Sequence, residues 1–112
     1  MGVKGAFFMY GIIFEVWPHA SGRDRYFELA AKLKTLLVQQ PGFISVERFE
    51  SLMEEGKLLS LSFWESEQAI VNWRSQLDHI EAQKEGKEKL FERYRIRVVK
   101  IERDYSFSAD TP

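Results

Sequence analysis

The order of apolar patterns along the chain constrains its fold more than any single motif does. Four segments have the aromatic and β-branched content of strands, and the stretches between them include apolar residues at helical spacings of three and four. Strands are expected at 7–17, 43–50, 57–64 and 94–105, and helices at 21–40 and from Ser66 to about Phe91. The order β-α-β-β-α-β, with the second helical part divided near Asp78, is typical of a ferredoxin-like α+β fold with an antiparallel sheet.

Turn-forming residues separate these segments. Pro18 ends the first strand, since proline cannot donate to a sheet ladder. Ser21 is the expected N-cap of the first helix, with Asp24 as a weak capping-box partner. Pro41-Gly42 stops that helix, and the polar segment 51–56 has the length of a hairpin connection.

The chain of 112 residues is predicted to form one domain, with a core over about 7–105 and a flexible tail at 106–112. Two helices cover only one face of a four-stranded sheet, so the other face must meet water or another molecule. The apolar residues expected on that open face are Phe7, Met9, Ile13, Phe49, Val99 and Ile101. A large exposed apolar patch usually marks an interface, which predicts a homodimer formed through the open face.

The charge and cysteine content exclude several classes of function. Sixteen basic and 17 acidic residues give a net charge of −1, so neither nucleic acid nor an anionic membrane is an expected partner. Cysteine is absent and there are only two histidines, which excludes disulfides, thiolate chemistry and a closed zinc site. The apolar run 6–14 is too short to span a bilayer and reads as a strand, so a cytoplasmic location is expected.

Residues along most of the chain resemble the antibiotic biosynthesis monooxygenase (ABM) domain over roughly positions 10–105. The residues that carry the resemblance are Pro41–Phe49, Leu59–Ala69, Trp73-Arg74, Asp78-His79, Ala82-Gln83, Gly86, Tyr94-Arg95 and Arg103–Tyr105. The resemblance implies a dimeric α+β barrel, in which two ferredoxin-like sheets pack together and exchange their C-terminal strands.

The resemblance leaves the chemistry open. Some relatives oxidise polycyclic aromatic compounds with dioxygen and without metal or flavin, others bind and degrade haem, and many have no known activity. The haem-degrading branch has an Asn on the first strand, a Trp on the second helix and a His ten residues later. Here Trp73 matches the tryptophan, but Gln83 takes the histidine position and Glu15 lies near the asparagine position. We therefore expect no cofactor, with haem bound through His79 as the alternative.

Two residues are candidates for acid–base catalysis. His79 has the ordinary pKa that suits a general base, and its alternative is a polar residue at a helix start. Glu15 ends an apolar strand, where burial would raise its pKa and make it a base. The alternative for Glu15 is an edge position or an ion pair with Arg95 or Arg97.

Aromatic and polar residues around the third strand and second helix are candidates for substrate binding. The set is Phe63, Trp64, Trp73, Arg74 and Gln83, and no metal ligands are predicted. Trp64 and Trp73 have two possible roles. They either line a pocket for a planar ligand or fill the core where the second helix packs on the third strand. Arg74 either contacts a substrate oxygen or is solvated.

The leading hypothesis is a homodimeric ABM-like protein that oxygenates a small aromatic or quinol-like compound without a cofactor. A base such as His79 would deprotonate the substrate, whose anion then reduces dioxygen itself. The alternatives are a non-catalytic dimer that binds a small aromatic molecule, and a haem-binding or haem-degrading protein.

Overall fold

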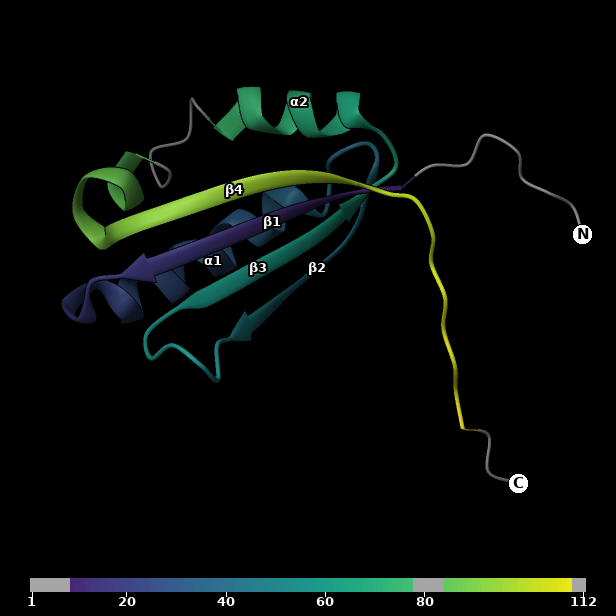
Figure 1. The fold of residues 1–112 in the computed structure, drawn as a ribbon. Coiled ribbons are helices and arrows are strands. Elements are labelled where there is room, and N and C mark those ends of the chain that lie inside the picture. Colours follow the sequence, from purple (N-terminus) through teal and green to yellow (C-terminus); the bar gives the residue numbers. More distant parts are fainter. Residues whose placement is uncertain (1–8, 78–83, 110–112) are drawn as a thin grey trace, which may run out of the picture.

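Four antiparallel strands form one sheet, and both helices lie on the same side of it (Figure 1). The computed structural model describes residues 9–77 and 84–109. The strands are β1 (Met9–Pro18), β2 (Phe43–Glu50), β3 (Leu58–Trp64) and β4 (Phe91–Ile101), in the spatial order β2-β3-β1-β4. The helices are α1 (Arg23–Leu37) and α2 (Glu67–Leu77). The predicted ferredoxin-like α+β fold is confirmed.

Alternation along the strands gives the sheet two different faces. On β1, Val16 packs against Tyr26 and Ala30 of α1, so residues of the same parity face the helices. The odd-numbered residues of β1 and their cross-strand partners face away from both helices and make up what we call the open face. It consists of Met9, Gly11, Ile13, Glu15, Trp17, Ser45, Glu47, Phe49, Leu59, Leu61, Phe63, Arg93, Arg95, Arg97, Val99 and Ile101. The apolar residues expected there lie on it, except Phe7, which is outside the described residues.

Two clusters of buried side chains hold the helices on the sheet. Tyr26 and Ala30 of α1 pack on Val16 and Leu58. Ala69, Ile70 and Trp73 of α2 pack on Trp64, which has no exposed surface. The two helices pack at separate places on the same face of the sheet. The part of that face between them can therefore line a cavity.

The first helix begins one residue later than the predicted N-cap indicates. The predicted N-cap, Ser21, lies within a short 3₁₀ turn (Ala20–Gly22), and Gly22 caps α1 without a side-chain hydrogen bond. A Cβ atom on Gly22 would lie 3.1 Å from Leu90, so a tertiary contact fixes the chain at this point. The prediction of Ser21 as the cap was therefore wrong, whereas Ser66 caps α2 as expected, accepting a hydrogen bond from the Ala69 N–H at 3.1 Å.

The last strand is displaced toward the N-terminus relative to the expected segment 94–105. It begins at Phe91, after a π-helical turn (Gly86–Leu90), and ends at Ile101, because its ladder with β1 runs from Pro18 to Met9. Residues 102–109 leave the sheet as an extended segment (Figure 1), and Tyr105 and Phe107 on it are almost fully exposed. Positions 78–83 of the predicted second helical stretch lie outside the described residues. No helix in the described ranges is long and apolar enough to cross a membrane.

Candidate functional site

A cavity of about 190 Å³ lies between the helix-facing side of the sheet and the two helices. All four strands contribute to its floor through alternate residues, as the side-chain period of two requires. The floor residues are Ile12, Phe14, Val46, Arg48, Ser60, Ser62, Tyr94 and Ile96. The walls and rim are formed by Tyr26, Leu29, Ala30, Leu33, Lys34, Leu37, Trp73, Arg74, Leu77, Lys87 and Phe91. Most of this lining is apolar, so the cavity suits an apolar ligand.

Aromatic rings flank the cavity at two places. Trp73 lines it and stacks on the buried Trp64, with ring centroids 6.5 Å apart and an angle of 30° between the planes. Trp64 itself is core, and its indole N–H donates to the Ser62 hydroxyl at 2.9 Å. Of the two alternatives for this pair, Trp64 takes the core role, while Trp73 is both core and cavity wall.

The second aromatic group comes from strands and helix α1. Phe14 packs against Phe91 and Tyr94, with ring centroids 6.2 and 5.7 Å away, and Tyr26 packs against Phe91 at 5.7 Å. All four rings line the cavity. None of the four was predicted as a binding residue, although Phe14 and Tyr94 lie in segments that were expected to be strands.

The sequence-predicted binding residues divide between the two faces of the sheet. Trp73 and Arg74 line the cavity together. Phe63 lies on the open face, where it lines a separate hollow, and it does not line the helix-face cavity. The reason is the strand period, since Phe63 and the helix-facing Trp64 are neighbours on β3. His79 and Gln83 lie outside the described residues.

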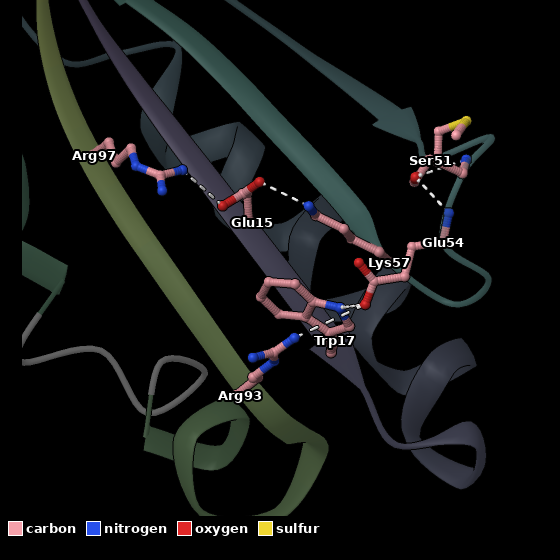
Figure 2. Close-up of polar contacts among 8 residues, drawn as sticks. Glu15, Trp17, Ser51, Glu54, Lys57, Arg93 and Arg97 are labelled. Carbon is pink, nitrogen blue, oxygen red and sulfur yellow. Dashed lines mark hydrogen bonds and ion pairs between the residues drawn. The ribbon is translucent and has the colours of Figure 1, made fainter.

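Glu15 is held by two cations on the open face, away from the cavity (Figure 2). Its carboxylate lies 2.9 Å from the Lys57 Nζ and 3.0 Å from an Arg97 guanidinium nitrogen, and its side chain is 17% exposed. The hydrogen bond from Lys57 lowers the pKa of Glu15, with further lowering by Arg97 and Arg95, against the opposing effect of burial. The expected raised pKa was wrong, because neighbouring charges outweigh burial here. The alternative of an ion pair with the last strand is confirmed for Arg97.

A second polar group on the open face adjoins Glu15. The guanidinium of Arg93 lies over the Trp17 ring, 4.0 Å from its centroid, and the Lys57 ammonium lies 5.1 Å from it. The Trp17 indole N–H donates to Glu54 at 2.6 Å, and Ser51 accepts hydrogen bonds from two backbone N–H groups of the same loop (Figure 2). These contacts fix the β2–β3 loop against β1 and β4 and give this end of the open face a defined shape.

Replacing Glu15 with glutamine is expected to lower the thermal unfolding midpoint at pH 7, because the ion pairs with Lys57 and Arg97 are lost. The folded pKa of Glu15 lies below its ordinary value of 4.5, so its ionised form stabilises the fold at every pH above that value. This contribution disappears as the pH falls through the lowered pKa.

Thermal denaturation followed by circular dichroism should show the unfolding midpoints of the unchanged chain and of Glu15→Gln converging in acid. Glu65→Gln, at an exposed position without an ion pair in the described ranges, is the matched control. A midpoint difference that stayed constant into strong acid would contradict this account.

The described lining offers no histidine or cysteine to a haem group, and His79, the expected alternative ligand, lies outside the described residues. A haem ligand in such a site is usually an imidazole or a thiolate, and the lining residues include neither. Within the described ranges the one histidine is His19, which is exposed near Glu92 and does not line the cavity. The same ranges contain no group of three metal-ligating side chains.

Comparison with known sequences fits the fold and the cavity. Residues 9–85 match the sequence model of the family described as "Antibiotic biosynthesis monooxygenase" (ABM). The chain belongs to the ABM family. Within it, a protein of Pyricularia oryzae named jasmonate monooxygenase ABM is 39% identical over 93 residues, which cover 83% of this chain and 43% of that protein. The uncharacterized protein YqjZ of Bacillus subtilis is 34% identical over 86 residues, 77% of this chain and 74% of that protein. The chain thus spans less than half the length of the first relative.

Solved ABM-fold structures share the architecture at low sequence identity. A variant of SnoaB, described as a cofactor-independent oxygenase from Streptomyces nogalater, superimposes with a TM-score of 0.74 at 10% identity, covering 86% of this chain and 95% of that chain. The heme-degrading protein Rv3592 from Mycobacterium tuberculosis has a TM-score of 0.66 at 14% identity, covering 90% and 99%. At such identities the similarity establishes the fold alone, and the chemistry must come from the site.

Proposed function

We propose that this ABM-family chain is a monooxygenase that oxidises a small aromatic or quinol-like compound in the helix-face cavity without a cofactor. The observation that carries the proposal is the aromatic, largely apolar cavity bounded by Trp73 and Tyr94. Its volume of about 190 Å³ lies below the roughly 300–1,000 Å³ typical of sites for drug-sized ligands. A substrate with one or two rings therefore suits it best.

The proposed reaction uses the substrate itself as the reductant of dioxygen. In a phenol, a base takes the hydroxyl proton, and the electron-rich anion passes electrons to O₂. One oxygen atom then bonds to the ring carbon para to the hydroxyl. The other oxygen atom leaves as water with the displaced ring hydrogen and the phenolic proton, and the phenol becomes a quinone. Dioxygen accepts all four electrons, so the reaction balances without a further reductant.

The protein would contribute orientation, a dry site and proton transfer. Trp73 and Phe14 line the cavity with aromatic rings that a planar substrate can pack against, and Arg74 lines the cavity where it can contact a substrate oxygen. We propose His79 as the general base, since it follows the cavity-lining Leu77 by two residues in the sequence. Glu15 is not included, because it lies on the other side of the sheet.

Oxygen consumption with 1-naphthol, followed at an oxygen electrode together with quinone absorbance, tests the proposal. We expect turnover above the rate without protein, and a loss of about 10²–10⁴-fold in kcat for His79→Ala, the usual contribution of a general base. His19→Ala is the matched control, because His19 is exposed and does not line the cavity. Unchanged turnover in His79→Ala would remove His79 from the mechanism. Absence of turnover with 1-naphthol would contradict the proposed activity.

A non-catalytic binding protein is the second candidate. It is supported by one observation: the described lining of the cavity contains neither a carboxylate nor an imidazole that could act as a base. This candidate predicts saturable binding of aromatic ligands without oxygen consumption, which the same measurements detect.

We also propose that two copies associate through the open face, as the family resemblance implies. The supporting observation is the row of apolar side chains on neighbouring strands, including Ile13, Leu61 and Phe63, that neither helix covers. The almost fully exposed Tyr105 and Phe107 on the extended C-terminal segment add apolar surface that a second copy can bury. Besides this partner, the proposed partners are limited to a small ligand, and the cytoplasm is the proposed location.

A further inference from the structure

The charged residues that line the helix-face cavity all have the same sign. They are Lys34 of α1, Arg48 of β2, Arg74 of α2 and Lys87 of the π-helical turn. No carboxylate lines the cavity among the residues that the structure describes. The chain as a whole has more acidic than basic residues, with a net charge of −1. The excess of positive charge is therefore a property of this site and does not follow from composition.

Within the described residues, these four cations differ from many others in making no ion pair. On α1, Arg23 pairs with Glu50, and Arg25 with Glu28 and Glu85. On the open face, Lys57, Arg93 and Arg97 also pair with glutamates. In contrast, Lys34, Arg48, Arg74 and Lys87 make no ion pair within the described ranges. Their positive charge is available to a ligand.

Arg48 is the cation best placed on the cavity floor. In the register of β2 and β3 it is directly opposite Ser60, so the two side chains lie side by side on the helix-facing side. The Ser60 hydroxyl has no hydrogen-bond partner within the described part of the chain. A guanidinium beside a free hydroxyl offers several donors in one place, and a guanidinium matches the two oxygens of a carboxylate.

We propose that the cavity selects an apolar monocarboxylate, with its rings against Trp73 and Tyr94 and its carboxylate at Arg48 and Ser60. Lys34 and Lys87 add positive charge at the rim. This inference rests on the proposed function, because it specifies the substrate class of the same cavity. The small volume favours one or two rings with a single acidic group.

Calorimetric titration of the full chain with three naphthalene derivatives tests the inference. We expect 2-naphthoate to bind about tenfold more tightly than neutral 2-naphthylmethanol in low salt, with the preference decreasing as salt screens the charges. Arg48→Gln should remove most of this preference by weakening the binding of 2-naphthoate, and Lys34→Gln should reduce the preference by a smaller factor. Lys32→Gln, which removes a charge from α1 outside the cavity, is the matched control and should change neither affinity.

Each outcome separates this inference from the proposed function. Equal affinity for 2-naphthoate and 2-naphthylmethanol would overturn the carboxylate preference. The cavity would then bind aromatic compounds without selecting a carboxylate. Tighter binding of 2-naphthyl phosphate than of 2-naphthoate would also overturn it, because the selected anion would then be a phosphate. Binding of none of the three would contradict the proposed function itself. A carboxylate preference that survived Arg48→Gln would exclude Arg48 as the recognition residue.

Discussion

Replacing Gly42 with alanine is expected to destabilise the protein by more than about 2 kcal/mol. Gly42 has a φ of +86°, a conformation that costs a residue with a Cβ atom roughly 1–2 kcal/mol. A Cβ atom there would also lie 2.6 Å from the Cβ of Ala69, well inside van der Waals contact. Since the Gly42 carbonyl accepts a hydrogen bond from the Glu65 N–H at 2.8 Å, relief of this clash would strain the junction of β2 and α2. Urea unfolding followed by circular dichroism measures the loss.

Two further variants separate the conformational cost from the steric cost. Gly56 has nearly the same φ, +83°, but a Cβ atom on it would meet nothing within 4 Å. Gly56→Ala should therefore cost only the conformational part, about 1–2 kcal/mol. Ala69→Gly in the Gly42→Ala background should recover part of the loss, because it removes the clashing atom. Equal losses for Gly42→Ala and Gly56→Ala would show that the contact with Ala69 has no energetic weight.

Replacing Leu61 with lysine is expected to convert the proposed dimer into a monomer. Leu61 lies in the middle of the open face, between Ile13 of β1 and Glu47 of β2. In a single chain the lysine stem can lie along the sheet with its ammonium near Glu47, so the fold is retained. Against a second copy, the two ammonium groups and the Glu47 carboxylates beside them would have to lose their water, which is unfavourable. Light scattering should give twice 13.2 kDa for the unchanged chain and 13.2 kDa for the variant.

Val71→Lys is the matched control for this experiment. Val71 is half-exposed on α2, on the other side of the sheet from the open face, so the same change in charge should leave the mass unaltered. Circular dichroism of both variants confirms that they fold. A monomer mass for the unchanged chain at micromolar concentration would contradict the proposed dimer, and a dimeric Leu61→Lys variant would place the interface elsewhere.

The elements of the fold could be predicted because they rest on local patterns. The apolar stripe of α1 and the alternation of β3 are readable from spacing alone, and Pro41-Gly42 forms the turn between α1 and β2 as expected. The errors lie at boundaries that distant residues decide. The contact of Leu90 with Gly22 sets the start of α1, and the ladder with β1 sets the ends of β4.

The cavity could be predicted only in part. Trp73 and Arg74, which were expected to bind substrate, lie on α2 and line the cavity, and their contact with a substrate stays a prediction. Phe63 could have been assigned to the opposite face from the strand period alone. Nothing in the sequence indicated that Arg48 and Ser60 bind a ligand, because arginine and serine are common on strands. Only the register of β2 and β3 brings them together beneath the helices.

Spacing and turn residues alone determined the order of the elements, the antiparallel sheet and the pairs of residues that share a face. The tertiary structure decided what each face meets. It placed Glu15 between Lys57 and Arg97, which lowers its pKa, and it gathered around one apolar cavity four cations that make no ion pair in the described part of the chain. The physical reason is that periodicity is a property of neighbouring residues, whereas charge balance and desolvation depend on groups that are far apart in the sequence.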